Sequence, residues 1–257
     1  MAQTAQPPRR KREKTFGWRV LAAVVIPWLL LISRYRIRDG HKMPRTGAVV
    51  LAPNHYSNLD PVTTGYIVWK LGRVPRFLAK ASVFKVPVVG SILRATGQIP
   101  VERQAGGRNT QSLQEAARLV DDGLALIIYP EGTLTREPDL WPMRGKSGAV
   151  RMALEHGVPI VPMAHWGVQH ILPRYSKKVS LFPRKTIDAI VGDPVDMSPW
   201  IGKPITHELL AEATEAVMVE ITKLLEQLRG ETAPEGRWDP TAHGQSEIGR
   251  FDTPPSA

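Results

Sequence analysis

A histidine and an aspartate stand five residues apart in the stretch "NHYSNLD", directly after an apolar run. Imidazole titrates close to neutral pH and is the side chain most often used as a general base. On a continuous helix, residues five apart lie about 140° from each other, so His55 and Asp60 can meet only if the chain bends between them. Asn54, Ser57 and Asn58 favour such a bend. The spacing therefore allows Asp60 to accept the Nδ1 proton of His55, which leaves Nε2 as a base.

Both residues also have an explanation that needs no catalysis. Asp60 precedes Pro61, which suits the first position of a helix, so we predict that Asp60 is a helix N-cap. A hydrogen-bonded structural histidine is the usual explanation for a residue such as His55. Its position between a strand and a helix instead favours a base that acts directly on a substrate hydroxyl or on water, without a serine or cysteine nucleophile. The capping role of Asp60 is compatible with orienting this base.

Two other apolar runs also end in turns with chemically capable side chains. "GQIPV" is followed by Glu102 and Arg103, and "LALIIY" is followed by "PEGTLTR". In open α/β sheets, ligands bind at the carboxyl ends of the strands. We therefore expect these turns to meet the His55 turn in one site.

The rest of the chain must supply the sheet that positions these turns. Apolar runs typical of strands alternate with helical patterns after residue 34. The predicted strands cover residues 35–40, 47–53, 76–80, 97–102, 124–130, 158–166 and 185–194, and the predicted helices cover residues 62–72, 109–123, 145–157 and 206–230. Thr206 is the expected N-cap of the last helix. The alternation predicts an α/β fold with a single, largely parallel mixed sheet flanked by helices.

The first 34 residues have the composition of a membrane-associating segment. Their apolar stretch, Val20 to Ile32, is 13 residues long and contains Pro27, whereas a spanning helix needs about 20 residues. Tryptophans and flanking arginines favour a helix in the membrane interface on the cytoplasmic face, where basic residues meet anionic lipid. A buried core helix and a secretory signal are the alternatives, but "ISRYR" offers no cleavage site of small residues.

Charge and composition limit the other classes of function. The net charge of +10 favours phosphate-rich partners such as anionic lipid, nucleic acid or a phosphorylated substrate. The absence of cysteine excludes disulfides, thiolate zinc sites and a cysteine nucleophile. "GKS" at residues 145–147 is no P-loop because Leu140 replaces the required glycine, and His165 and His170 have no carboxylate cluster nearby. We expect no metal and no bound prosthetic group.

Four blocks of the sequence, taken together, resemble the PlsC-like glycerolipid acyltransferase family, whose best-known members are 1-acylglycerol-3-phosphate O-acyltransferases. "NHYSNLD" resembles its H-x4-D motif, and "GQIPVER", "YPEGTLTR" and "VPIVPM" resemble the next three motifs in the family's order. The resemblance covers roughly Tyr35 to Pro194. It leaves out most of the N-terminal segment and the C-terminal residues, which composition assigns. We therefore expect a basic N-terminus with a membrane-associating helix at 1–34, an acyltransferase domain at 35–229 and, where glycine, proline and acidic residues replace the apolar pattern, a disordered tail at 230–257.

The resemblance implies acyl transfer from acyl-CoA or acyl-carrier protein to the sn-2 hydroxyl of lysophosphatidate, with no further cofactor. His55 would be the base and Asp60 its orienting partner, while Arg103 would bind the acceptor's phosphate. Glu131, Gly132 and Thr133 match the third motif, which would shape the acceptor pocket. In that motif an arginine usually follows the threonine directly, whereas two residues intervene before Arg136 here. Arg136, or Arg144 and Lys146, would then supply the charge.

Two alternatives stay open at this level. A member of the same family could acylate another lysolipid or a glycolipid, because the motifs do not separate these acceptors. A basic adaptor that binds anionic lipid or nucleic acid without chemistry would explain the charge. It gives no reason for His55, Asp60, Arg103 and Glu131 at strand ends, so we expect an enzyme whose partners are membrane lipid and an acyl donor and do not include nucleic acid.

Overall fold

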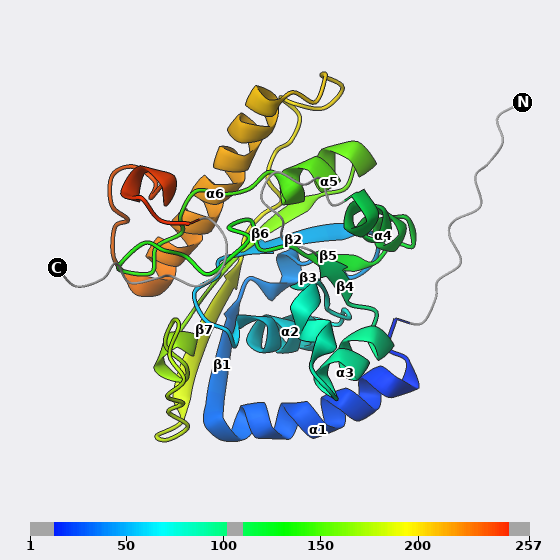
Figure 1. The fold of residues 1–257 in the computed structure, drawn as a ribbon, viewed down its shortest axis with the longest axis vertical. Helices are drawn as coiled ribbons and strands as arrows, with labels where there is room; N and C mark the ends of the chain where they lie inside the picture. Colours follow the sequence, from blue (N-terminus) through cyan, green and yellow to red (C-terminus); the bar gives the residue numbers. More distant parts are fainter. Residues whose placement is uncertain (1–12, 102–109, 247–257) are drawn as a thin grey trace, which may run out of the picture.

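The computed structural model describes residues 13–101 and 110–246, which contain one seven-stranded sheet (Figure 1). The strand order is β1-β7-β6-β2-β5-β3-β4. Neighbouring strands run parallel except for β6 and β7, which are antiparallel. The strands are β1 (Ser33–Arg38), β2 (Val49–Pro53), β3 (Arg76–Lys80), β4 (Ile99–Val101), β5 (Ala125–Ile127), β6 (Ile160–Trp166) and β7 (Lys185–Val191). The predicted α/β fold with a largely parallel mixed sheet is confirmed.

Helices cover both faces of the sheet, and this explains why its central strand is apolar at every position. In β2, Val49 and Leu51 pack on the side of α2 (Asp60–Lys70), while Val50 and Ala52 pack on the opposite side. That opposite face is covered by α4 (Thr110–Asp121), α5 (Gly148–His156) and α6 (His207–Arg229). All four β2 side chains are fully buried, as expected of a strand inside a parallel sheet.

The longest helix, α6, has the ends that the sequence predicts. The Thr206 side chain accepts a hydrogen bond from the backbone N–H of Leu209, which is the expected N-cap interaction. The helix ends at Gly230, which adopts the left-handed conformation that glycine permits at no steric cost.

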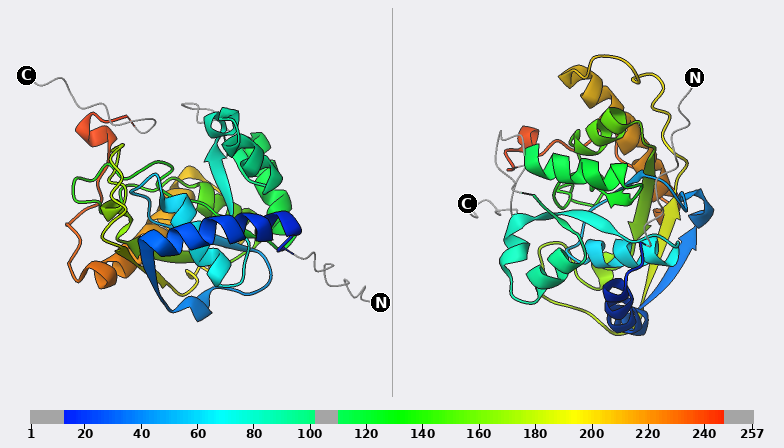
Figure 2. Two further views of the ribbon diagram at one scale, coloured as in Figure 1. Left: turned by 90° about the horizontal axis from the view of Figure 1, so that it is seen from below. Right: turned by 90° about the vertical axis from the view of Figure 1, so that its right-hand side faces the viewer.

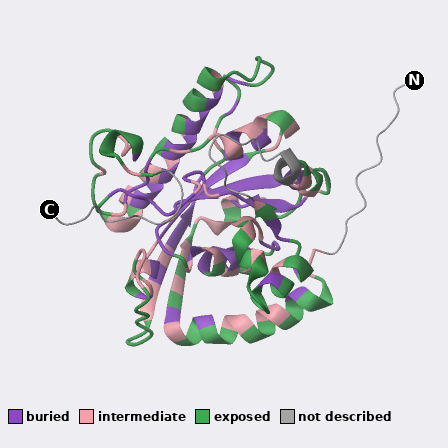
Figure 3. Cartoon of the chain, viewed as in Figure 1, coloured by how far each residue is buried: buried purple, intermediate pink, exposed green. Residues whose placement is uncertain are grey.

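The N-terminal helix α1 (Phe16–Ile32) lies along one end of the molecule, at the bottom of Figure 1. Trp18 stacks on Trp69 of α2, with ring centroids 6.2 Å apart. Most of its other side chains are exposed or only half-buried, as the green and pink of Figure 3 show. No helix in the described part of the chain is both long enough and apolar enough to span a membrane.

Two regions differ from the expectation. Residues 81–95 form a 3-10 helix, η2 (Ala81–Lys85), and a short helix, α3 (Val89–Ala95), where no helix is predicted. Their valines and Pro87 give no helical pattern, since several of the apolar side chains face outward.

The predicted disordered tail also differs. Arg237 forms an ion pair with Glu215 of α6 at 2.8 Å, and the backbone carbonyl of Trp238 accepts from the N–H of Arg144. Residues 231–246 therefore pack on the domain, which is incompatible with disorder from residue 230. The rest of that predicted tail, 247–257, lies outside the described residues.

Candidate active site

The turn between β2 and α2 brings the predicted histidine and aspartate into contact. Nδ1 of His55 and Oδ2 of Asp60 lie 2.9 Å apart. The aspartate side chain is fully buried, whereas 12% of the His55 side chain is exposed. Because the carboxylate can only accept, the neutral imidazole donates from Nδ1, and its Nε2 carries the lone pair. This is the arrangement that a general base requires.

Asp60 is not the N-cap that the sequence predicts. Leu59 occupies that position, and no side chain caps the helix there. Asp60 is instead the first helical residue, and its Oδ2 accepts from the backbone N–H groups of Tyr56 and Ser57, both at 2.7 Å. The carboxylate therefore faces backward into the turn, and these bonds form the bend that His55 needs to reach it.

The imidazole of His55 is held from one side by an aromatic ring. Tyr129, two residues after β5, stacks on His55 with ring centroids 4.1 Å apart and planes inclined by 22°. The Tyr129 hydroxyl donates to Oγ1 of Thr64 in α2. Burial raises the pKa of Tyr129 well above its usual value, so this ring stays neutral. Stacking and the bond to Asp60 together leave the imidazole little rotational freedom.

A second histidine supports the turn from behind. His165 of β6 is fully buried and donates from Nε2 to the backbone carbonyl of Asn54, so its Nδ1 accepts from the Tyr56 hydroxyl at 3.0 Å. The Asn54 side chain also pairs with the backbone of His165 in both directions. Burial lowers the pKa of His165, which keeps it neutral. His165 therefore packs in the core behind the turn.

Glu131 of the third motif connects the His55 turn to a distant loop. Its Oε1 accepts from the backbone N–H of His55 at 2.9 Å, and its Oε2 accepts from that of Met143 at 3.1 Å. The side chain is buried, and burial raises its pKa to about 8, against the lowering effect of these bonds. Glu131 thus fixes the backbone that carries the base.

The residues after Glu131 pack tightly against the same turn. Gly132 adopts a left-handed conformation with φ of +68°, and a Cβ atom there would lie 3.0 Å from Cδ of Lys146. Thr133 is buried, and the N–H of Thr135 donates to the carbonyl of His55 at 2.7 Å. Arg136 follows directly and is only 2% exposed. The third motif therefore lies beside the His55 turn, as the strand ends predict.

Arg174 is a site residue that the sequence does not reveal. Its guanidinium donates to the backbone carbonyls of Thr135 and Glu137, at 2.7 and 2.6 Å. Burial lowers its pKa, and Arg136 is among the charges that act on it. No motif surrounds Arg174 in the sequence, so only the folded chain shows that it holds the third-motif loop.

The second-motif arginine, Arg103, lies outside the described residues, as does Glu102. The strand before them, β4, pairs with β3 at the far edge of the sheet from β1. The role of Arg103 therefore stays a prediction.

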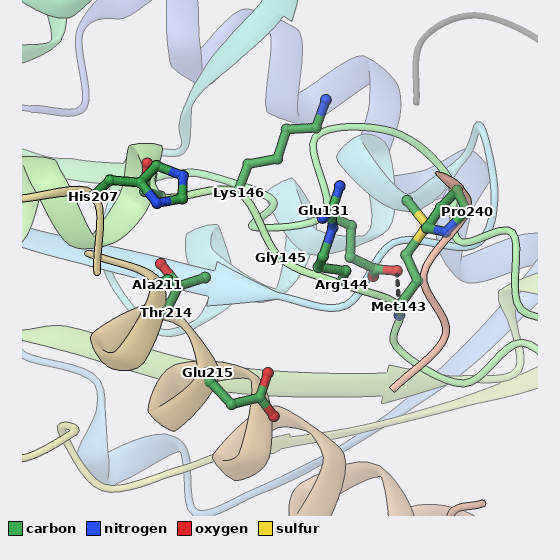
Figure 4. A pocket seen from close by; sticks show the side chains of 11 residues that line it. Glu131, Met143, Arg144, Gly145, Lys146, His207, Ala211, Thr214, Glu215 and Pro240 are labelled. Atoms are coloured by element: carbon green, nitrogen blue, oxygen red, sulfur yellow. Dashed lines mark hydrogen bonds between the residues drawn. The ribbon is translucent and has the colours of Figure 1, made fainter. Parts of the chain in front are cut away.

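A cavity of about 450 Å³ lies next to Glu131 (Figure 4). Lys146 and Arg144 border it from the loop after β5, and Ala211 and Thr214 border it from α6. His55 is not among its lining residues, and Glu131 connects the two, because it lines the cavity and bonds the backbone of His55. The described residues include no cluster of three or more histidine or acidic side chains that could hold a metal ion.

Comparisons with known proteins show which family the chain resembles. A family model described as Acyltransferase matches residues 34–166. The chain is 32% identical over 177 residues to the chloroplastic 1-acyl-sn-glycerol-3-phosphate acyltransferase BAT2 of Brassica napus, a match that covers 60% of this chain and 50% of the relative. It is 29% identical over 203 residues to the 1-acyl-sn-glycerol-3-phosphate acyltransferase of Bacillus subtilis strain 168, covering 78% and 92% of the two chains.

A solved structure shares the fold. The 1-acyl-sn-glycerophosphate (LPA) acyltransferase PlsC of Thermotoga maritima superposes with a TM-score of 0.62 and 23% identity, over 88% of this chain and 86% of that one. The chain spans half the length of the Brassica relative and most of the length of the Bacillus one. Because the family model covers more than half of the sequence and includes the His55 turn, the chain belongs to the acyltransferase family.

Proposed function

We propose that this protein is a membrane-associated 1-acylglycerol-3-phosphate O-acyltransferase. It would move an acyl group from acyl-CoA or acyl-carrier protein to the sn-2 hydroxyl of lysophosphatidate, which gives phosphatidate, on the cytoplasmic face of a membrane. The names of the Brassica and Bacillus relatives support this acceptor. The observation that carries the proposal is the 2.9 Å contact between His55 and the buried Asp60, which orients a base at the carboxyl end of a strand.

The proposed reaction needs one proton acceptor and no covalent enzyme intermediate. Nε2 of His55 takes the proton of the acceptor hydroxyl while its oxygen attacks the thioester carbonyl carbon. The C–S bond then breaks, and the departing thiolate takes up the proton from the imidazolium. The buried carboxylate of Asp60 stabilises the imidazolium in between, and general-base catalysis of this kind contributes about 10²–10⁴-fold.

The acceptor's phosphate would be bound by cationic side chains from the second and third motifs. Arg103 and Arg136 offer paired donors that match phosphate oxygens. Lys146 is exposed and borders the cavity beside Glu131, which supports it as a further contact. Thr133 and Gly132 would shape the wall between the base and these cations.

The test supplies lysophosphatidate and acyl-CoA to the purified protein in detergent and measures release of free CoA. We expect turnover by the wild type and a loss of at least about 10²-fold in His55→Ala. His156→Ala is the matched control, because His156 also faces an aspartate, Asp121, but at the surface and at 3.6 Å. Equal rates in wild type and His55→Ala would refute the mechanism.

The phosphate contacts are tested with the same assay. Arg103→Ala and Lys146→Ala should raise the apparent KM for lysophosphatidate more than they lower kcat, if each contact is equally strong before and during reaction. Lys203→Ala, in an exposed loop, is the control. Faster turnover of a neutral lysolipid or a glycolipid than of lysophosphatidate would assign a different acceptor within the same family.

A further inference from the structure

The connection between β6 and β7 begins at the active site. Its first turn is the 3-10 helix η3 (Val168–His170), and the Ser57 hydroxyl donates to the carbonyl of Leu172 at 2.7 Å. Arg174 then holds the third-motif loop through two backbone carbonyls. Both motif turns therefore fix where this connection leaves the site.

Beyond these contacts the connection becomes apolar and exposed. Val179, Leu181 and Phe182 are 54%, 42% and 65% exposed. The stretch "KKVSLFPRK" places two basic residues on each side of them, at Lys177, Lys178, Arg184 and Lys185. We call residues 177–185 the basic loop. Exposed apolar side chains with cationic flanks are typical of segments that enter the interface of an anionic membrane.

The basic loop lies at the same end of the molecule as α1. Nε of Arg184 donates to the carbonyl of Ser33, where α1 passes into β1, and Ser33 is the register partner of Lys185. In Figure 1 the connection between β6 and β7 and α1 both reach the lower end, and the right-hand view of Figure 2 places them there too.

The two elements offer the same kind of surface. Helix α1 also exposes large apolar side chains, which no part of the described fold covers. Those that are more than half exposed are Phe16, Val24, Trp28 and Leu31. A contact with another protein would need no basic flanks, whereas a bilayer with anionic lipid accounts for the apolar side chains and the cations together.

We propose that the basic loop is a second membrane contact, which inserts Leu181 and Phe182 into an anionic bilayer beside α1. The proposal rests on the membrane association in the proposed function and not on the acyl transfer itself. The basic loop follows Leu172 and Arg174, which tie the same connection to the active site, so its insertion places the His55 turn close to the lipid surface and the acceptor reaches the base from the bilayer.

The absence of cysteine makes a direct test possible. Phe182→Cys and Ile201→Cys each give one thiol for a fluorophore that brightens in apolar surroundings. Ile201 is 64% exposed, almost the same as Phe182, but it belongs to the segment between β7 and α6 at the opposite end of the molecule (Figure 1). With vesicles of phosphatidylglycerol we expect a blue shift and an increase for the label at 182 and no change for the label at 201.

Unlabelled variants measure the strength of the contact. Phe182→Asp should raise the lipid concentration for half-maximal sedimentation with these vesicles by about tenfold or more, and Ile201→Asp should leave it unchanged. In detergent, Phe182→Asp should keep wild-type CoA release, which separates this proposal from the proposed function.

Three results would overturn the proposal. One is vesicle binding without any response of the label at 182, which would leave α1 as the contact. Another is no binding to the vesicles at all. The third is a response of that label that follows protein concentration in the absence of vesicles, which would assign the loop to contact between two copies of the chain.

Discussion

The Asp60 carboxylate has two roles: it shapes the turn after β2, and it orients the His55 base. One oxygen, Oδ2, accepts from two backbone N–H groups and from the imidazole of His55. The first two bonds shape the turn, and the third sets the tautomer of the base. A change at this residue should therefore affect folding and catalysis together.

Replacement of Asp60 by asparagine tests that coupling. An uncharged amide is a weaker acceptor and cannot stabilise the imidazolium, so we expect kcat to fall by about 10²-fold or more and the free energy of unfolding to fall by about 1–3 kcal/mol. Urea unfolding and CoA release measure the two effects. Asp193→Asn, which removes an exposed partner of Lys42, is the control and should change neither. A variant with full activity would refute the orienting role.

The raised pKa of Glu131 predicts a dependence of stability on pH. Burial shifts it from 4.5 to about 8, so the stabilising contribution of its protonated form is complete below pH 4.5 and is lost as pH rises through 8. Between these limits the wild type should lose about 1.4 kcal/mol per pH unit relative to Glu131→Gln. Urea unfolding of both proteins at pH 5.5 and pH 8.5 measures the difference. If the free energy of unfolding changes by the same amount in both proteins between these pH values, Glu131 does not titrate in this range.

At the scale of elements, the sequence predicts the secondary structure well wherever hydrophobic periodicity governs it. All seven predicted strands and the four predicted helices occur, because buried faces dictate their patterns. Residues 81–95, which include the short helix α3, escape prediction because their valines favour a strand and all four are exposed, at Val83, Val86, Val88 and Val89. Asp60 at a helix start looks like a cap, and only its bonds to His55, Tyr56 and Ser57 in the folded chain show that it faces back into the turn.

Gly167, in the turn after β6, lies very close to the backbone of β7. Gly167 has φ of +112°, and a Cβ atom there would lie 2.1 Å from the backbone oxygen of Thr186 in β7. Gly167→Ala should lower the free energy of unfolding by at least about 3 kcal/mol, since backbone must shift. Gly202→Ala is the control, because its φ is +76° with no atom within 4 Å, and it should cost only about 1 kcal/mol. Equal losses in the free energy of unfolding of the two variants would show that the close approach of Gly167 to β7 does not matter for stability.

At the scale of the whole molecule, the order of the strands decides which residues meet. The sequence marks His55, Asp60 and Glu131 because each follows an apolar run. It does not reveal the roles of Tyr129, His165 and Arg174, since those roles depend on β5 and β6 flanking β2. The packing of residues 231–246 on α6 is likewise unpredictable from a composition rich in glycine and proline.

The C-terminal segment should contribute to the stability of the domain. Arg237 bonds both oxygens of Glu215 and also Oγ1 of Thr222. We expect Arg237→Ala to lower the free energy of unfolding by about 1–2 kcal/mol. The control, Arg151→Ala, removes an exposed pair with Glu155 within α5 and should change it by less than about 0.5 kcal/mol. Thermal or urea unfolding of both variants measures these changes. Equal changes in the two variants would show that the C-terminal segment does not stabilise the domain.

Glu131 has a practical consequence for redesign. One of its oxygens secures the backbone of the base, and the other secures Met143 at the wall of the cavity. Engineering that begins at this wall would therefore disturb the chemistry as a side effect. Ala211 and Thr214 on α6 line the same space and are not bonded to the His55 turn, which makes them the safer positions for altering ligand preference.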